Sequence, residues 1–307
     1  MDILLQQIIN GLVQGSVYAL VALGYTMVYG ILGLINFAHG EVVMIGAMIA
    51  LTALQALLAA AFAPVLAVLL SLMIAMAVCM ALGYSIERIA YRPLRNAPRL
   101  APLITAIGVS IVLQNLAMMI WGREYHSFPL PFSSTSHQIG GAVVNDVQLG
   151  IVLVALLVML GLMWLVHRTR LGRAMRAVAE NPAAASLMGV DINRVISVTF
   201  MLGSALAAIA GFMVSANYGI VHYYMGFMLG LKAFTAAVLG GIGNLRGAML
   251  GGVLLGLIES LGAGYIGDLS GGFLGSHYQD VFAFFVLIAV LVLRPSGLLG
   301  EKLAERA

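Results

Sequence analysis

A series of long apolar runs restricts the fold of this chain more than any other feature. The longest run reaches from Val42 to Tyr84 without one charged side chain. Because a membrane-spanning helix needs about 20 apolar residues, this run can hold two helices, with Pro64 at the turn between them. The whole chain is 62% hydrophobic and 9% charged, whereas a soluble domain carries about 25% charged residues. We therefore expect an all-α, polytopic helical membrane protein, with no stretch polar enough for a soluble ATPase domain.

The apolar runs predict about eight transmembrane helices, with interrupted or half-length segments in two places. One interruption lies near residues 24–41, where Gly24, Gly30 and Gly33 break a run that is too long for a single crossing. The other lies near residues 229–247, where a half-length run ends in a glycine-rich turn. The N-terminus has neither a basic segment nor an evident cleavage site, so we expect the first run to remain in the mature protein.

Positive charge is concentrated in a few loops, and this sets the expected orientation. Translocated loops carry few Lys and Arg residues, and 12 of the 15 in this chain fall in residues 88–99, 168–194 and 294–306. We place these three segments in the cytoplasm, and the C-terminus with them. The net charge of +3 comes from the same loops and implies no nucleic-acid partner.

The segments between these loops are expected to be periplasmic. They carry few Lys or Arg residues and contain the aromatic or glycine residues of an interfacial region: 123–148, 217–229 and 262–277. We therefore expect Arg95 and Arg173 to face the cytoplasm and Ser134 and Ser270 to face the periplasm. The first apolar run allows one crossing or one and a half, and we expect a cytoplasmic N-terminus.

A short helix is encoded within the cytoplasmic segment 168–194. Asn181 can act as its N-cap, Pro182 suits its first position, and Gly189 can take the left-handed position after its last turn. The helix between them would span about two turns and present apolar side chains to the cytosol. One interpretation is a docking site for a partner protein, and the other is a surface helix that only stiffens the loop.

A few polar side chains at membrane depth are the candidates for a transport pathway. Ionisable groups there are costly and usually face a polar interior or pair with one another. Paired breaks in corresponding halves of a transporter indicate its substrate site. Residues 36–92 and 244–294 both begin at a polar break and end in Arg-Pro. The candidate pathway residues are Asn36, His39, Glu41, Lys232, Thr235 and Asn244.

Other interpretations of these residues stay open. Glycine pairs, as in residues 11–15 and 252–256, can serve helix packing alone. His39 and Glu41 could be solvated at an interface, and as metal ligands they supply too few donors. The sequence around Ser110 resembles the Gly-x-Ser of intramembrane serine proteases, a three-residue match that is expected by chance.

The sequence Ala183-Ala-Ala-Ser-Leu-Met-Gly189 resembles the Glu-Ala-Ala-x-x-x-Gly box of ABC-importer permeases, whose short coupling helix docks on the ATPase. It departs from that motif at Ala183, where the motif has Glu, and it lacks the distal Ile-x-Leu-Pro. It is more similar to the version found in branched-chain amino-acid permeases. The resemblance implies an ATPase-coupling role for Arg173, Arg176, Glu180, Asn181, Pro182, Ala183, Ala184, Ser186, Leu187 and Gly189.

Three further motifs occur in order with the coupling loop: Gly24-Tyr-Thr-Met-Val-Tyr-Gly-Ile-Leu-Gly-Leu-Ile-Asn-Phe-Ala-His-Gly-Glu41, Ile86-Glu-Arg-Ile-Ala-Tyr-Arg-Pro-Leu-Arg95 and Lys232-Ala-Phe-Thr-Ala-Ala-Val-Leu-Gly-Gly-Ile-Gly243. The set is similar to the first permease of the high-affinity leucine, isoleucine and valine ABC importer of proteobacteria. The resemblance implies one non-enzymatic permease domain over residues 1–307, in the bacterial inner membrane. The implied partners are a homologous second permease, two cytoplasmic ATPases that hold ATP and Mg²⁺, and a periplasmic binding protein. No cofactor is implied on this chain.

Three alternatives to this function remain at the level of the sequence. Permeases of the same family carry urea, short amides or other amino acids, and nothing in the residues excludes these cargoes. A stand-alone secondary transporter would also use broken helices, but it would have no ATPase for the short helix to contact. An intramembrane enzyme would need a catalytic pair, which the sequence does not supply.

Overall fold

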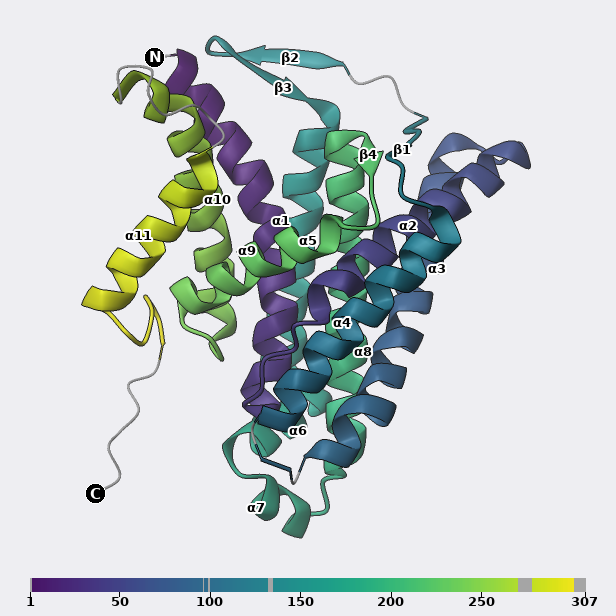
Figure 1. Ribbon diagram of the computed structural model, residues 1–307, viewed down its shortest axis with the longest axis vertical. Helices are drawn as coiled ribbons and strands as arrows, with labels where there is room; N and C mark the ends of the chain where they lie inside the picture. The colour runs from purple at the N-terminus through teal and green to yellow at the C-terminus, as the bar shows by residue number, and fades with distance from the viewer. Residues whose placement is uncertain (1, 96, 99, 132–134, 270–277, 301–307) are drawn as a thin grey trace. The chain divides into compact units, whose positions relative to one another are not determined.

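The computed structural model describes residues 2–95, 97–98, 100–131, 135–269 and 278–300. These residues form eleven α-helices, a π-helical and a 3₁₀ turn, and two short antiparallel strand pairs, β1–β4 and β2–β3. In chain order (Figure 1) the elements are α1 (Asp2–Leu32), α2 (His39–Ala59), α3 (Pro64–Ile86), η1 (Glu87–Tyr91), η2 (Arg92–Leu94), α4 (Leu100–Trp121), β1 (His126–Ser127), β2 (Ser136–Ile139), β3 (Ala142–Asn145), α5 (Asp146–Arg168), α6 (Arg170–Glu180), α7 (Pro182–Leu187), α8 (Ile192–Tyr218), β4 (Ile220–Val221), α9 (Met225–Gly240), α10 (Leu245–Leu269) and α11 (Gln279–Leu293).

The polytopic helical fold is confirmed. Among the described residues, seven helices are long and apolar enough to cross a membrane, and two shorter apolar helices, α9 and α11, accompany them. The half-length segment expected near residues 229–247 is α9, which has 16 residues. The predicted number of about eight lies between the seven full-length spans and the total that includes the short helices. Ser134 and Ser270, whose sidedness was predicted, lie outside the described residues.

The chain forms two compact units. One contains residues Met1–Thr26, Ser134–Met159 and Lys232–Ala307, and the other contains Met27–Ser133 and Leu160–Leu231. We call them the α10 unit and the α8 unit, after the long helix in each. Helices α1, α5 and α9 each give one part to each unit.

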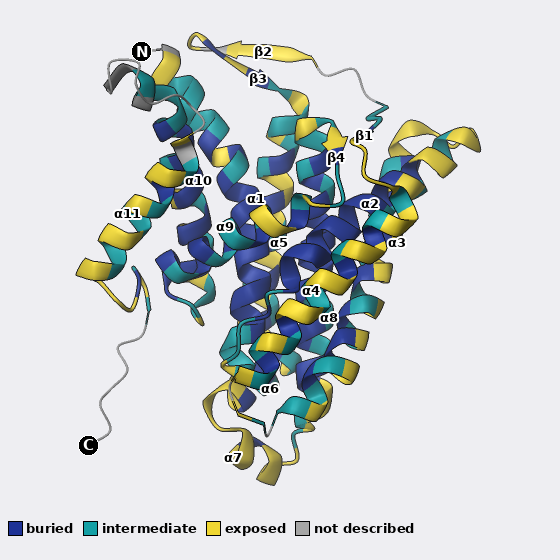
Figure 2. Ribbon diagram, viewed as in Figure 1, coloured by how far each residue is buried: buried dark blue, intermediate teal, exposed yellow. Residues whose placement is uncertain are grey.

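The core of the α8 unit is the crossing of α2, α3 and α8, where buried residues concentrate (Figure 2). The backbones come close because Gly46 on α2 faces Ala208 on α8: a Cβ added at Gly46 would lie 2.7 Å from the Ala208 Cα. The thiol of Cys79 on α3 fills the same crossing, 3.7 Å from the Val42 carbonyl oxygen. Small residues therefore set how closely these three helices pack, and the cysteine has a packing role there.

In the α10 unit, α1 packs closely against α10 through glycines on both helices. A Cβ added at Gly15 would lie 2.8 Å from the Cα of Val253, and one at Gly11 would lie 2.8 Å from the Cα of Leu257. The small residues that the sequence places at residues 11–15 and 252–256 therefore meet each other. Lipid gives no hydrophobic drive for helices to associate, so close backbone approach of this kind supplies the packing energy. The packing interpretation of these glycine pairs is confirmed.

Loops predicted to be cytoplasmic and loops predicted to be periplasmic lie at opposite ends of the α8 unit (Figure 1). At one end, which carries α6 and α7, Arg95 Nη1 donates a hydrogen bond to Asn193 Oδ1 over 2.6 Å. At the other end β1 pairs with β4, and the Phe128 N–H donates to the Gly219 carbonyl over 2.9 Å. Residues from 88–99 and 168–194 therefore share one end, and residues from 123–148 and 217–229 share the other. This is the alternation that the charge pattern predicts.

The expectation of a cytoplasmic N-terminus and the assignment of residues 123–148 to the periplasm are inconsistent with each other, because the start of α1 contacts that segment. In the α10 unit, Gln6 exchanges two hydrogen bonds with the backbone of Val143 in the β2–β3 hairpin, over 3.1 and 2.8 Å. That hairpin belongs to the predicted periplasmic segment 123–148. Gln7 also accepts a bond from Ser260, far along α10 from the end where Asn244 bonds the Leu299 carbonyl. The start of α1 therefore lies at the same end of the α10 unit as the β2–β3 hairpin, opposite the C-terminal segment.

The first predicted interruption is narrower than expected. Helix α1 continues through Gly24 and Gly30 to Leu32, and the break covers residues 33–38, where Gly33 has a φ of +62°. Glycine costs a helix only about 1 kcal/mol relative to alanine, whereas each unpaired backbone group in a bilayer costs several kcal/mol. The helix therefore runs through glycines unless other contacts satisfy the freed backbone groups.

We predict that Gly15→Ala destabilises the protein by about 1–3 kcal/mol, because the added methyl group meets the α10 backbone with no room to move. Gly150→Ala, on a part of α5 where an added Cβ meets nothing within 4 Å, is the matched control. It should be neutral, or stabilise by up to about 1 kcal/mol through helix propensity. Thermal unfolding of both variants in detergent tests this, and equal stability of the two would contradict the close-packing interpretation.

Candidate functional site

The predicted short helix exists, with both predicted ends. Helix α7 spans Pro182–Leu187, and Asn181 Oδ1 accepts a hydrogen bond from the Ala184 N–H over 3.0 Å, as an N-cap does. Pro182 occupies the first turn, and Gly189 has a φ of +81°. The N–H of Gly189 donates to the Ser186 carbonyl over 3.0 Å. The helix is therefore fixed at both ends by its own sequence.

The outer surface of α7 is exposed and partly apolar (Figure 2). The side chains of Leu187 and Met188 are 89% and 85% exposed, and Ala183, Ala184 and Ser186 are also exposed. Only Ala185 faces the protein. Two large apolar side chains side by side at a polar end of the protein are the composition expected of a surface that a partner covers.

Helix α6, which precedes α7, was not predicted from the sequence. Its N-cap is Thr169, whose Oγ1 accepts from the Gly172 N–H over 3.1 Å. It buries Gly172, Met175 and Val178 on one face and exposes the predicted coupling residues Arg173, Arg176 and Glu180 on the other. The spacing of three residues between the buried positions is the signal that could have revealed it. The helix gives α7 a rigid base on its N-terminal side.

On the C-terminal side of α7, a buried charge cluster joins the start of α8 to the end of α3. Glu87 has no exposed side-chain surface and accepts bonds from Arg92 over 2.8 and 3.2 Å and from Ser197 over 2.7 Å. Arg95 also pairs with Glu87, and its other nitrogen bonds Asn193 over 2.6 Å. We call Glu87, Arg92, Arg95, Asn193 and Ser197 the Glu87 cluster. It links α3 to the helix that begins just after α7.

The break between α1 and α2 holds the first predicted pathway residues. Asn36 Oδ1 accepts hydrogen bonds from the Ala38 N–H over 3.1 Å and from the Tyr91 hydroxyl over 2.9 Å. Asn36 thereby satisfies a backbone group that the break would leave unpaired. His39 begins α2 and is buried, as is Glu41 in the same first turn.

Glu41 lies deep within the α8 unit. It is the third residue of α2, and its Oε1 accepts a bond of 3.3 Å from the hydroxyl of Ser110. Ser110 is halfway along α4, so the carboxyl group lies about half a span from either end of that helix. The alternative in which Glu41 is solvated at an interface does not hold, because 1% of the residue is exposed.

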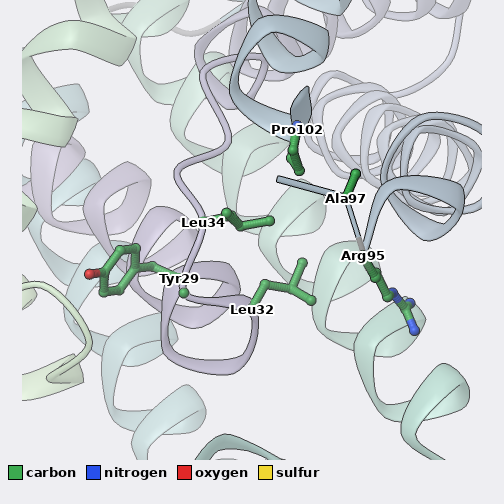
Figure 3. Close-up of a pocket in the computed structure, with 7 residues that line it drawn as sticks. Tyr29, Leu32, Leu34, Arg95, Ala97 and Pro102 are labelled. Carbon is green, nitrogen blue, oxygen red and sulfur yellow. The ribbon is translucent and has the colours of Figure 1, made fainter. Parts of the chain in front are cut away.

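A cavity of about 370 Å³ opens beside the break, at the end of the α8 unit that carries Arg95. It is lined by Tyr29, Leu32, Gly33, Leu34, Arg95, Ala97 and Pro102. Figure 3 shows the side chains of Leu32 and Leu34 extending toward the wall that carries Ala97 and Arg95. The break therefore has a partly open space, whose exposed lining is mainly polar, at the end where the positively charged loops gather.

The remaining predicted pathway residues belong to the α10 unit. Lys232 pairs with Glu259 over 3.3 Å and with Asp280 over 2.6 Å, and Tyr18 donates to the same Glu259 oxygen over 2.7 Å. These side chains come from α1, α9, α10 and α11 and form a second buried charge cluster. Its members pair with one another, which is one of the two outcomes expected for charges at membrane depth.

Two further residues of the predicted set have clear positions. Thr235 is buried on α9, within a turn of Lys232. Asn244 precedes α10, where its Oδ1 accepts from the N–H groups of Arg246 and Gly247 over 3.0 and 3.2 Å, and its Nδ2 donates to the Leu299 carbonyl over 2.8 Å. Asn244 therefore caps α10 and holds the C-terminal segment. Its role in a pathway stays a prediction, as do those of the other five residues.

We predict that Glu87→Ala destabilises the protein by about 1–3 kcal/mol, because it removes the buried acceptor of Ser197 and of two partly exposed arginines. Glu124→Ala, which removes an exposed carboxylate, is the control and should change stability by less than about 0.5 kcal/mol. Thermal unfolding in detergent measures both. A Glu87→Ala protein as stable as the control would show that the cluster does not hold α3 to α8.

Comparison with known proteins identifies the family. The family described as the permease component of the branched-chain amino acid transport system matches residues 7–291. The high-affinity branched-chain amino acid transport system permease protein BraD of Pseudomonas aeruginosa is 48% identical, over 98% of this chain and 97% of its own length. LivH of Escherichia coli, which has the same description, is 45% identical over the same shares of both chains.

A more distant relative is the autoinducer 2 import system permease protein LsrC of Klebsiella pneumoniae, which is 35% identical over 66% of this chain and 58% of its own length. No solved structure matches the chain. The family match covers nearly all of the described helices, and two full-length relatives share close to half of their residues with this protein. The chain therefore belongs to the permease family of the branched-chain amino acid transport system.

Proposed function

We propose that this protein is the membrane-spanning subunit of an ATP-driven importer that carries leucine, isoleucine and valine across the bacterial inner membrane. The full-length relatives are named as permeases of high-affinity branched-chain amino acid systems, which supports this cargo. The observation that carries the ATP-driven part is α7, a short helix capped at both ends with 85–89% exposed apolar side chains. A stand-alone carrier has no use for such a surface.

The contacts around α7 give a route by which an ATPase could move the permease. A push on α7 reaches α6 and α8 directly, because both pack against it. From the start of α8, the hydrogen bonds of Asn193 and Ser197 to the Glu87 cluster carry the movement to α3. From there the Tyr91 hydroxyl bonds Asn36 in the break between α1 and α2. The first link is packing and the later links are hydrogen bonds, so a movement of α7 would reach the break through contacts within the α8 unit.

The proposed assembly contains four kinds of subunit. This chain would form a single permease domain and pair with a homologous second permease. Two cytoplasmic ATPases would hold ATP and Mg²⁺, and a periplasmic binding protein would deliver the amino acid. This chain would then need no cofactor of its own and would catalyse no reaction. The exposed Arg173, Arg176 and Glu180 of α6 would border the ATPase beside α7.

A second candidate cargo comes from the relatives. LsrC is named as a permease for autoinducer 2, so one family accommodates cargo other than an amino acid. Permeases for urea, short amides or other amino acids belong to the same group of alternatives. The higher identity and full coverage of BraD and LivH favour the branched-chain amino acids.

We predict that Ala184→Arg weakens ATPase binding by about 100-fold or more, because it buries an unpaired charge in a contact shaped for alanine. Gly189→Val should strain the left-handed turn by about 1–2 kcal/mol and misplace α7. Ala60→Arg, at an exposed alanine on the end of the α8 unit away from α7, is the matched control. Co-purification of the ATPase, its hydrolysis rate and leucine uptake in liposomes are measured together. Wild-type values for Ala184→Arg would remove α7 as the docking site.

The proposed orientation places α6, α7 and the C-terminus in the cytoplasm and the N-terminus in the periplasm. We predict that a cysteine at Ile3, which is exposed, reacts with an impermeant maleimide from outside the cell. A cysteine at Arg173 should react only after the membrane is opened. Both variants are made with Cys79 replaced by alanine. Labelling at 173 from outside, or none at 3, would overturn the orientation.

A further inference from the structure

Glu41 has one carboxylate oxygen that nothing in the described structure satisfies. Its Oε1 accepts from Ser110 over 3.3 Å, while its Oε2 is buried and has no hydrogen-bond partner. Only 1% of the residue is exposed. No lysine or arginine of the described chain pairs with it. A buried acceptor without a partner is rare in native proteins and calls for a specific explanation.

Capping of α2 does not explain this carboxylate. Glu41 is at the third position of α2, from which an acidic side chain can reach back to the N–H of the N-cap residue. The N-cap here is Ala38, and its N–H already donates to Asn36 Oδ1 over 3.1 Å. The helix start is therefore satisfied without Glu41, and the free oxygen points elsewhere.

The free oxygen lies beneath the first turn of α9. A Cβ added at Gly226 would lie 2.8 Å from Glu41 Oε2 and 2.5 Å from the Gly40 carbonyl oxygen. From the α2 side, a Cβ added at Gly40 would lie 2.8 Å from the Cα of Gly230 on α9. The starts of α2 and α9 thus meet backbone to backbone through three glycines. Of the three atoms nearest to a Cβ added at Gly226, one is backbone, one is Glu41 Oε2 and one is the Cβ of Met44, at 2.9 Å; the three nearest to a Cβ added at Gly40 are all backbone. Few side-chain contacts therefore oppose the withdrawal of α9 from α2.

We propose that Glu41 Oε2 binds the ammonium group of the amino acid in transit when the start of α9 withdraws from the start of α2. The inference rests on the proposed amino-acid cargo and names the group that recognises it. An ammonium group donates the charge-assisted hydrogen bond that the free oxygen lacks. Ser110 would hold the other oxygen and so orient the carboxylate. A branched aliphatic side chain needs only apolar surroundings, which the helices around Glu41 supply.

Labelling of the carboxylate tests the recognition directly. The importer, assembled with its ATPases and binding protein and hydrolysing ATP, is treated with dicyclohexylcarbodiimide, and modification of Glu41 is read by mass spectrometry. Leucine and 3-methylbutylamine, which carry the ammonium group, should reduce labelling to about a tenth at ten times their dissociation constants. 4-Methylpentanoate, which has the same carbon chain without the ammonium group, should not protect. Glu259, equally buried in the other unit, is the internal control.

Three labelling results would overturn the proposal. They are equal labelling of Glu41 with and without the amine, protection by 4-methylpentanoate, and no labelling of Glu41 during turnover, because the site would then never open. If the wild-type importer failed to carry leucine, the proposed cargo would be wrong. The amine result would still report on Glu41, so the two failures are distinct.

Substitutions separate the ammonium site from a carboxyl group that is simply protonated. Glu41→Gln should reduce leucine uptake by about tenfold or more, since hydrogen bonds to charged groups have that value. Glu41→Asp should retain part of the uptake, and Ser110→Ala should lose less than Glu41→Gln. ATPase co-purification should be unchanged in all three, because none touches α7. Wild-type uptake by Glu41→Gln would show that a proton satisfies the carboxyl group and would refute the site.

Discussion

The structure depends on one constraint: within a bilayer, backbone N–H and C=O groups must find partners inside the protein. The constraint keeps α1 helical through Gly24 and Gly30, where a soluble helix could bend at little cost. It also explains what accompanies each break. Asn36 bonds the N–H of Ala38 where α2 begins, and Asn244 bonds two N–H groups where α10 begins. The polar residues at the breaks are first of all substitutes for lost backbone bonds.

Charged groups in the membrane region follow the same requirement. Glu87 is surrounded by two arginines and a serine, and Glu259 receives bonds from a lysine and a tyrosine. Buried pairs of this kind contribute little net stability, because the cost of removing the charges from water offsets their attraction. Their effect is to fix which helices are joined, as the Glu87 cluster joins α3 to α8. Glu41 is the contrasting case, with a buried oxygen that the described chain leaves unsatisfied.

In the proposed mechanism, the Glu87 cluster connects the ATPase contact at α7 with the break beside Glu41. Helix α7 is rigid and exposed, and the Glu87 cluster ties the helix that follows it to α3. The hydroxyl of Tyr91, the last residue of η1, bonds Asn36, five residues before Glu41. In the proposed mechanism, a movement of α7 would reach α8 through packing and would then pass through the Glu87 cluster and Tyr91 to Asn36 in the break. Beside the break, the starts of α2 and α9 meet through Gly40, Gly226 and Gly230.

The sequence alone determined the membrane-spanning helical fold, the half-length α9 and both ends of α7, because composition, charge distribution and helix caps act over a few neighbouring residues. It also singled out Asn36 and Glu41, since polar groups at membrane depth stand out in an apolar run. Other features depended on tertiary structure. Glu87 bonds Ser197, 110 residues away, and Gln6 near the start of α1 bonds Val143, 137 residues away in the β2–β3 hairpin. No local pattern encodes contacts between segments so far apart, so only the folded chain decided them.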